Sequence, residues 1–165
     1  MMNLVGFVFV LGLVGDVPGP DHANCPMARA HGHRAEVDAR HDEATGVAHE
    51  GVVHHFLLAE DGGSIQLEVK DADQDEARDR IRAHLQVVAR SFTAGDFSLP
   101  MSIHGQVPPG VAVMKERRKT IHYAYAPTEK GGAVRISTRD ARALDAVREF
   151  LRFQIQDHGT GDPTE

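Results

Sequence analysis

The chain has 165 residues, of which 41% are apolar and 25% charged, a balance typical of one globular domain of ordinary size. The formal net charge is −6 and no long basic stripe is present, which argues against nucleic acid as a partner. The single cysteine, Cys25, cannot form a disulfide within the chain. Eleven histidines are the unusual feature of the composition, because imidazole is the commonest metal ligand and titrates near neutral pH.

The N-terminus begins with an apolar run over residues 4–14, followed by a segment rich in Gly and Pro. This run is too short to span a bilayer but fits the hydrophobic region of a secretory signal. We therefore expect residues 1–20 to be a signal peptide and the protein to be periplasmic or extracellular. Membrane contact is then expected only through an uncleaved signal segment. The alternative is a buried N-terminal strand or helix, since no Lys or Arg precedes the run.

Residues 21–50 are predicted to form a His-rich polar arm, because their apolar positions follow neither a helical nor a strand period. A short helix is expected near residues 28–39. The arm carries the triplet His31-Gly32-His33, and with His41 and Cys25 this is a weak candidate for a metal-capturing segment. The alternative is a solvated polar arm with no ligand.

The folded domain is expected over residues 51–158, with a disordered tail at 159–165. Residues 52–59 and 64–69 are predicted strands, joined by a turn at Asp61-Gly62-Gly63, because glycine tolerates the positive φ that tight turns need. A helix should follow, with a capping box at residues 73–76 and a stop at Gly95. Its apolar face is formed by Ala77, Ile81, His84, Leu85, Val88 and Phe92.

The same pattern returns in the second half of the chain. Residues 120–126 and 133–138 are predicted strands around a Gly131-Gly132 turn, and Ser137 or Thr138 is expected to cap a second helix. Placing Gly62 over Gly131 aligns the two halves at an offset of 69 residues. The Pro-rich connection between the halves is predicted to contain short strands near residues 101–104 and 111–115. The buried face of the second helix should contain Leu144, Val147, Leu151 and Ile155.

The predicted fold class is therefore α+β, with two ββα units forming a four- to five-stranded antiparallel sheet that carries two helices on one face. One unit alone would be marginal, while two units can share a sheet and bury both helices. Such a sheet leaves one face uncovered. A homodimer could cover that face if His54, Phe56 and Leu58 lie on it.

Several motifs together resemble a family of small exported bacterial proteins, some of which carry the name aspartate carbamoyltransferase. The resemblance covers roughly residues 31 to 162 and implies export and a shared fold, but supplies no mechanism. It rests, among others, on residues 54–58 (HHFLL), 61–63 (DGG), 95–97 (GDF), 107–111 (VPPGV) and 150–155 (FLRFQI).

The residues argue against carbamoyl transfer. Carbamoyltransferases hold carbamoyl phosphate on a Ser-Thr-Arg-Thr turn at a helix N-terminus. Here the run is Ser137-Thr138-Arg139-Asp140, and Asp140 puts a negative charge where the phosphate would sit. An N-cap with an acidic first turn explains the same residues.

The histidines of the first unit are the best candidates for a site. His84 should face the sheet, and one of the adjacent His54 and His55 must do the same, because neighbouring strand residues point to opposite faces. Convergence of imidazoles from different elements would suit Cu or Zn, in preference to haem. We predict His55, His84 and His104 as metal ligands with His54 as a substitute for one of them, and His31 and His33 as weaker candidates.

The predicted function is therefore an exported metal-binding or metal-handling protein that uses a histidine cluster. One alternative is a non-catalytic interaction or dimerisation module. The other is a small periplasmic enzyme, for which no nucleophile elbow or paired metal motif is present in the sequence. A lone histidine on an apolar helix face is also commonly a core residue bonded to backbone. The separation of the imidazoles in space discriminates between these readings.

Overall fold

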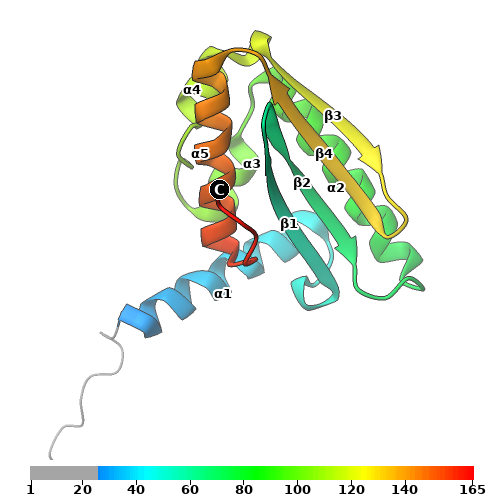
Figure 1. Cartoon of the computed structure of the whole chain (residues 1–165). Helices are drawn as coiled ribbons and strands as arrows, with labels where there is room; N and C mark the ends of the chain where they lie inside the picture. The colour runs from blue at the N-terminus through cyan, green and yellow to red at the C-terminus, as the bar shows by residue number, and fades with distance from the viewer. Residues whose placement is uncertain (1–25) are drawn as a thin grey trace, which may run out of the picture.

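The computed structural model describes residues 26–165 and has the predicted α+β fold, with a four-stranded antiparallel sheet (Figure 1). The predicted signal segment, residues 1–20, and Cys25 lie outside the described residues. The elements follow in the order α1 (Pro26–Thr45), η2 (His49–Gly51), β1 (Val52–Ala59), β2 (Gly62–Val69), α2 (Asp75–Ala94), α3 (Ser98–His104), α4 (Val111–Glu116), η3 (Arg118–Thr120), β3 (Ile121–Pro127), β4 (Gly131–Thr138) and α5 (Ala141–His158).

The sheet has the strand order β1-β2-β4-β3, so the two hairpins meet through their second strands. Ile65 on β2 pairs with Val134 on β4, which is its own equivalent at the offset of 69 residues. The flanking pairs Gly63–Ile136 and Leu67–Gly132 are related in the same way. The two ββα units are therefore related by an approximate two-fold axis that passes between Ile65 and Val134.

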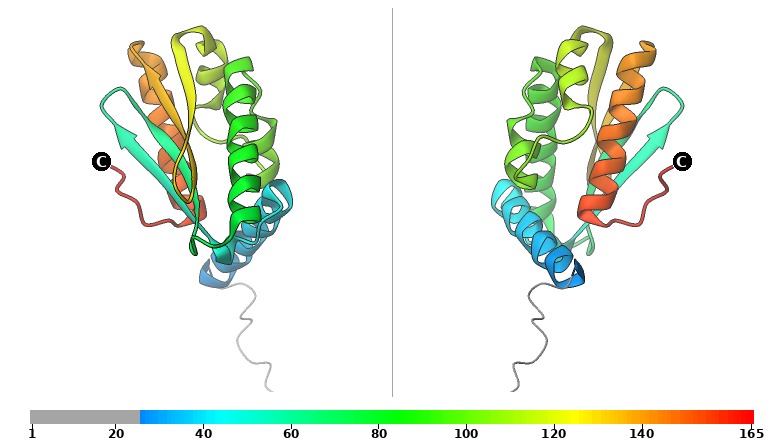
Figure 2. Two further views of the ribbon diagram at one scale, coloured as in Figure 1. Left: turned by 90° about the vertical axis from the view of Figure 1, so that its right-hand side faces the viewer. Right: turned by 90° about the vertical axis from the view of Figure 1, so that its left-hand side faces the viewer.

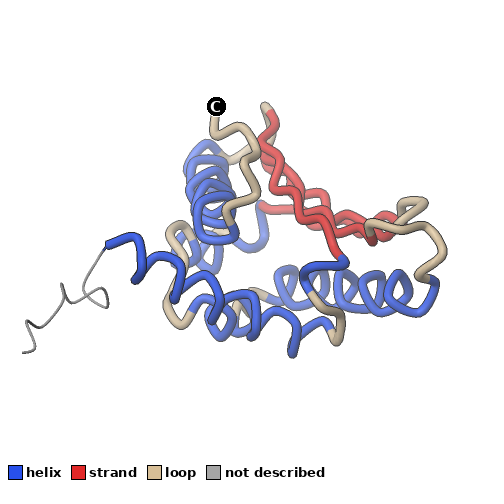
Figure 3. Tube along the Cα trace, turned by 90° about the horizontal axis from the view of Figure 1, so that it is seen from below, coloured by secondary structure: helices blue, strands red, loops and turns tan. Residues whose placement is uncertain are grey.

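Helices α2 and α5 cover one face of the sheet, and no helix of residues 26–165 lies on the other face (Figures 2 and 3). Each helix lies mainly against the strands of the other unit: α2 against β3 and β4, and α5 against β1 and β2. The core fills the space between sheet and helices, and its largest fully buried side chains include Phe92, Phe97, Phe150, Ile81, Leu85 and Met114. Neither unit buries its apolar surface without the other.

The connection between the units is helical, so the strands predicted near residues 101–104 and 111–115 are wrong. Residues 98–104 form α3 and residues 111–116 form α4, two short helices that bury Ile103, Val111 and Met114. Runs this short have the same apolar content in either state, and here packing against the helical layer favours the helix. The predicted capping box at residues 73–76 is also absent, because α2 begins at Asp75.

The second helix begins with a different cap from the one predicted. The carboxylate of Asp140, and not the hydroxyl of Ser137 or Thr138, accepts a hydrogen bond from the Ala143 amide at the start of α5. The side chain that would repel a phosphate therefore occupies the helix N-terminus itself.

The N-terminal arm is one continuous helix, longer than the short helix predicted near residues 28–39. Helix α1 crosses one end of the domain beside α2, α3 and α5 (Figure 1). It buries a single stripe, Val37, His41 and Thr45, in which successive members are four residues apart. Because that spacing keeps the three side chains on one helical face, α1 attaches to the domain through this stripe.

The C-terminal residues fold back on β1, whereas a disordered tail is predicted. The carboxylate of Asp162 accepts hydrogen bonds from His55 Nδ1 and from the Phe56 amide, at 2.8 and 2.9 Å. Thr164 accepts another through its carbonyl oxygen from Arg152. The tail thereby takes a backbone donor of the edge strand β1 that would otherwise remain unpaired.

The uncovered face of the sheet does not carry His54, Phe56 and Leu58. Phe56 is 3% exposed and points into the core, and His54 and Leu58 share its side of β1 because strand side chains alternate. The uncovered face presents mainly small and polar side chains instead, among them Ser64, Gln66, Ala124 and Arg135, and Leu57 is an exposed apolar residue on the same face. The homodimer stays a prediction, and the apolar residues expected to form its interface lie under the helices.

Candidate functional site

Three of the predicted ligands, His54, His84 and His104, meet at the end of the domain that α1 crosses. His54 projects from β1 on the helix side of the sheet, His84 lies on the apolar face of α2, and His104 ends α3. All three line one small cavity of about 50 Å³ between the sheet and the helices. The structure brings these elements together only through the tertiary fold.

Two further histidines complete a group of five. His41 comes from the buried stripe of α1, and His158 is the last residue of α5. The ring centroids of His41 and His54 are 4.4 Å apart, those of His54 and His158 are 5.5 Å apart, and those of His41 and His158 are 5.8 Å apart. His84 lies 5.9 Å from His41, and His104 lies 5.0 Å from His158. We call these five residues the histidine cluster.

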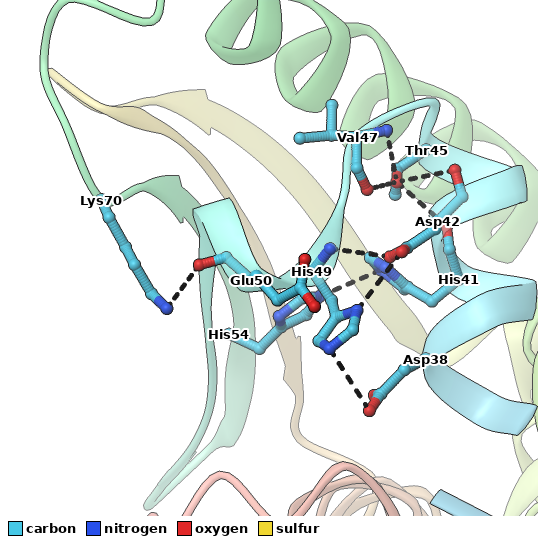
Figure 4. Close-up of polar contacts among 9 residues, drawn as sticks. All are labelled: Asp38, His41, Asp42, Thr45, Val47, His49, Glu50, His54 and Lys70. Carbon is cyan, nitrogen blue, oxygen red and sulfur yellow. Dashed lines mark hydrogen bonds and ion pairs between the residues drawn. The ribbon is translucent and has the colours of Figure 1, made fainter. Parts of the chain in front are cut away.

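The closest contact in the histidine cluster joins two ring nitrogens. His54 Nε2 lies 3.0 Å from His41 Nε2 (Figure 4). One ring nitrogen of this pair must donate and the other accept, so the two imidazoles cannot both be protonated at these positions. His41 is only 5% exposed, and its Nδ1 atom has no hydrogen-bond partner among residues 26–165. A buried polar atom without a hydrogen-bond partner lowers the stability of the fold by about 1–3 kcal/mol. The unpaired Nδ1 atom of His41 is therefore a destabilising feature of the cluster.

Burial favours the neutral form of four imidazoles of the histidine cluster, those of His41, His54, His84 and His158. Burial, followed by the neighbouring His54 imidazole, lowers the pKa of His41 to about 2. Burial and His84 lower the pKa of His54 to about 4, and burial and His54 lower the pKa of His158 to about 3. Burial also lowers the pKa of His84, against a hydrogen bond with the Ala44 backbone. At neutral pH these rings carry free lone pairs, which is the form that binds metal ions.

The cluster separates two hollows of different character. On the inner side, the small cavity is walled by aromatic and aliphatic side chains, among them Phe56, Phe92 and Phe150. On the outer side, a surface cleft of about 410 Å³ is lined by His41, His54 and His158 together with charged residues. The same imidazoles thus contact an apolar interior and a polar opening to solvent.

A chain of hydrogen bonds supports one edge of the histidine cluster. His104 Nδ1 lies 2.5 Å from Asp157 Oδ2, and His104 Nε2 lies 2.8 Å from Gln154 Oε1. The second oxygen of Asp157 lies 2.8 Å from His33 Nε2. Burial alone would raise the pKa of Asp157, but the hydrogen bonds from His104 and His33 hold it below its usual value. Asp157 therefore ties α1 and α3 to α5 through two imidazoles.

The remaining predicted ligands lie outside the histidine cluster. His55 points to the opposite side of β1 and contacts Asp162. His54, predicted as the substitute ligand, occupies the inward position that was expected for His55. His31 and His33 are exposed on α1, and only His33 approaches the site, through Asp157. His49 lies near the mouth of the outer cleft, where its ring is 3.3 Å from Asp42 and 3.7 Å from Asp38 (Figure 4).

Sequence reasoning placed His41 in the polar arm and did not single out His158. A signal for both exists in the spacing. His41 lies four residues from each of Val37 and Thr45 on one face of α1, and His158 continues the buried positions of Leu151 and Ile155 by one more turn.

Within residues 26–165, no group of three or more His, Cys, Asp or Glu side chains has its atoms placed so that it could hold a metal ion. In the same range, no helix combines the length and hydropathy needed to cross a bilayer. The chain matches no protein-family model, no curated protein and no solved structure.

Proposed function

We propose that the protein binds a transition-metal ion, copper or zinc, through the histidine cluster, and that it is exported to do so. The contact between His41 Nε2 and His54 Nε2 carries this proposal. The two nitrogen atoms are 3.0 Å apart. If an ion lay about 2.0–2.1 Å from each of them, the N–metal–N angle would be about 95°. That angle is near the right angle of tetragonal copper sites and about 15° from the tetrahedral value of zinc sites.

The spacing of the rings supports a third ligand. An imidazole bound through one nitrogen has its centroid about 3.2 Å from the metal, so two bound rings have centroids about 4.5–5.2 Å apart at angles between about 90° and 110°. The centroid separations of 4.4, 5.5 and 5.8 Å among His41, His54 and His158 lie close to this range. Because the Cβ–Cγ torsion of histidine has a broad energy profile, His158 can turn a nitrogen toward the pair with modest adjustment.

The chemical state of the cluster also favours metal binding. A metal must displace a proton from any charged imidazole, but burial already holds His41, His54 and His158 neutral at physiological pH.

Metal titration tests the proposal. Untagged protein is freed of metal with a chelator and titrated with Cu²⁺ and Zn²⁺ in a calorimeter, and the bound ion is counted by elemental analysis. We expect one ion per chain, and affinities at least 100-fold weaker in His41→Ala and His54→Ala. His122→Ala is the matched control, because His122 is exposed on β3. Circular dichroism establishes that each variant is folded.

Substoichiometric binding to the wild-type protein would overturn the proposal. So would an affinity that His41→Ala and His54→Ala leave unchanged while both variants remain folded. Equal losses in His31→Ala and His122→Ala would place the ion elsewhere on the surface.

A further inference from the structure

The outer cleft has the size and position of a small-molecule site. Its volume of about 410 Å³ falls within the usual range for ligand pockets. His41, His54 and His158 form its inner wall, so a molecule in the cleft would reach the imidazole nitrogens from the solvent side. The hollow on the other side of the cluster is about 50 Å³ and apolar, and could not admit a molecule of this kind.

The cleft carries more positive than negative charge, although the chain as a whole has a net charge of −6. Arg34 and Lys70 line it, against the single carboxylate of Asp38. Lys70 uses its ammonium group to donate to the Glu50 carbonyl oxygen at 2.6 Å (Figure 4). Asp38 lies 3.7 Å from His49 Nε2, so its charge faces an imidazole of the rim.

Arg34 is the distinctive residue of the cleft. It is half-buried on α1, yet it makes no hydrogen bond or ion pair with any residue in the range 26–165. Its guanidinium lies against Gly159, where an added Cβ would overlap it, and Gly159 directly follows His158. The planar guanidinium group of Arg34, which has five N–H donors, therefore lies beside the histidine cluster and can donate hydrogen bonds to a ligand.

We propose that this cleft, which we call the Arg34 cleft, binds a small oxyanion with at least three oxygens, either a dicarboxylate or a phosphate. Two oxygens of the anion pair with the Arg34 guanidinium, as such groups do in bidentate ion pairs. A remaining oxygen points to the inner wall and completes the coordination of the metal held by His41 and His54. The second half of this inference rests on the proposed metal site, while the first half does not.

Calorimetry with oxalate and with inorganic phosphate tests the two halves separately. Metal-free wild-type protein should bind at least one of these anions, and Arg34→Gln should weaken that binding at least tenfold. Arg142→Gln is the control, because it also removes one arginine charge but at the N-terminal end of α5, far along the helix from His158. It should leave the affinity unchanged, because Arg142 pairs with Glu116 outside the cleft. Tighter binding of oxalate identifies a carboxylate site, and tighter binding of phosphate identifies a phosphate site.

The copper-loaded protein tests the link to the metal. We expect it to bind the preferred anion at least tenfold more tightly than the metal-free protein, and the Cu²⁺ electron paramagnetic resonance spectrum to change on addition of the anion. Ultrafiltration checks that copper stays with the protein. A spectrum that does not change would overturn the metal link.

Failure of the metal site and failure of the cleft are distinguishable. If wild-type protein takes up no copper, the proposed function fails, and the metal-free titration still decides whether the cleft binds an oxyanion. If neither anion binds, or if Arg34→Gln binds as tightly as wild type, the inference about the cleft is overturned whether or not copper binds.

Discussion

His104 on α3 and Asp157 on α5 are joined by a hydrogen bond of 2.5 Å, and the other oxygen of the same carboxylate accepts from His33 on α1. One carboxylate therefore connects three helices at the edge of the histidine cluster. In a metal site, such a carboxylate fixes the tautomer and orientation of the imidazole that it contacts. The contact stabilises the fold whether or not a metal binds.

Asp157→Asn should lower the free energy of unfolding by about 1–3 kcal/mol, because hydrogen bonds to a charged group contribute more than neutral ones. Urea denaturation at neutral pH measures the change. Asp145→Asn is the control, since Asp145 is exposed on the same helix and should change stability by less than about 0.5 kcal/mol. An Asp157→Asn variant as stable as the control would show that this carboxylate does not hold the helices together.

The buried imidazoles of His41, His54 and His158 should make the protein sensitive to acid. In the folded state the pKa values of His41, His54 and His158 are held near 2, 4 and 3, whereas unfolded imidazoles titrate near 6.5. The unfolded chain therefore binds more protons below pH 6.5, and stability is full above that pH and falls as the pH drops toward the folded values. Each imidazole that stays neutral in the folded state contributes a loss of about 1.4 kcal/mol per pH unit.

Urea denaturation at pH 7, 6 and 5 tests this dependence. His41→Leu should reduce the slope of stability against pH, because one titrating group is removed. His122→Leu should leave the slope unchanged, since His122 is exposed. A wild-type stability that is constant between pH 7 and pH 5 would contradict the buried neutral state of His41, His54 and His158.

Tyr123 occupies the position on β3 that corresponds to His54 on β1 at the offset of 69 residues. Its side chain is buried, burial raises its pKa, and its hydroxyl has no hydrogen-bond partner among the described residues. Tyr123→Phe removes this unpaired group and should stabilise the protein by about 1 kcal/mol. Thermal and urea denaturation measure the gain, with Tyr125→Phe as the control; a loss of stability would show that the hydroxyl is bonded in solution.

Two glycines should respond in opposite directions to alanine. Gly110 has φ of +81°, and an added Cβ would overlap the Ala146 carbonyl of α5. Gly110→Ala should therefore cost at least about 2 kcal/mol. Gly32 lies within α1, and apart from the backbone of its own helix nothing lies within 4 Å of an added Cβ, so Gly32→Ala should stabilise by about 0.5–1 kcal/mol. Chemical denaturation of both variants measures the contrast, and equal effects would contradict the packing at α4 and α5.

The hairpins and long helices could be predicted because their patterns are local. Alternation on β2 and the apolar stripe of α2 identify a strand and a helix without knowledge of the rest of the fold. Helices α3 and α4 could not be identified, because a short apolar segment next to proline fits either state until its neighbours are known. The length of α1 was missed for a related reason: its few buried residues find their partners only in other elements.

The histidine cluster could be predicted only in part. His54 and His84 were accessible because each lies on the buried face of a predicted element, and His104 because it follows an apolar residue. The meeting of His41 with His54 depends on how α1 crosses the domain, and the sequence contains no local sign of that crossing. His158 depends in turn on where α5 ends against β1.

The exchange of helices between the units has an evolutionary consequence. Since α2 lies mainly against β3 and β4 while α5 lies mainly against β1 and β2, the helix of a single ββα unit would keep only its smaller contact, with the second strand of its own hairpin. An ancestral unit arranged in this way would have existed as a pair of identical chains, with the axis now found between Ile65 and Val134. Fusion of two such copies would free each half from the constraint of symmetry. One half could then acquire imidazoles at His54 and His84 while the other kept Tyr123 and Gln154 in the corresponding places.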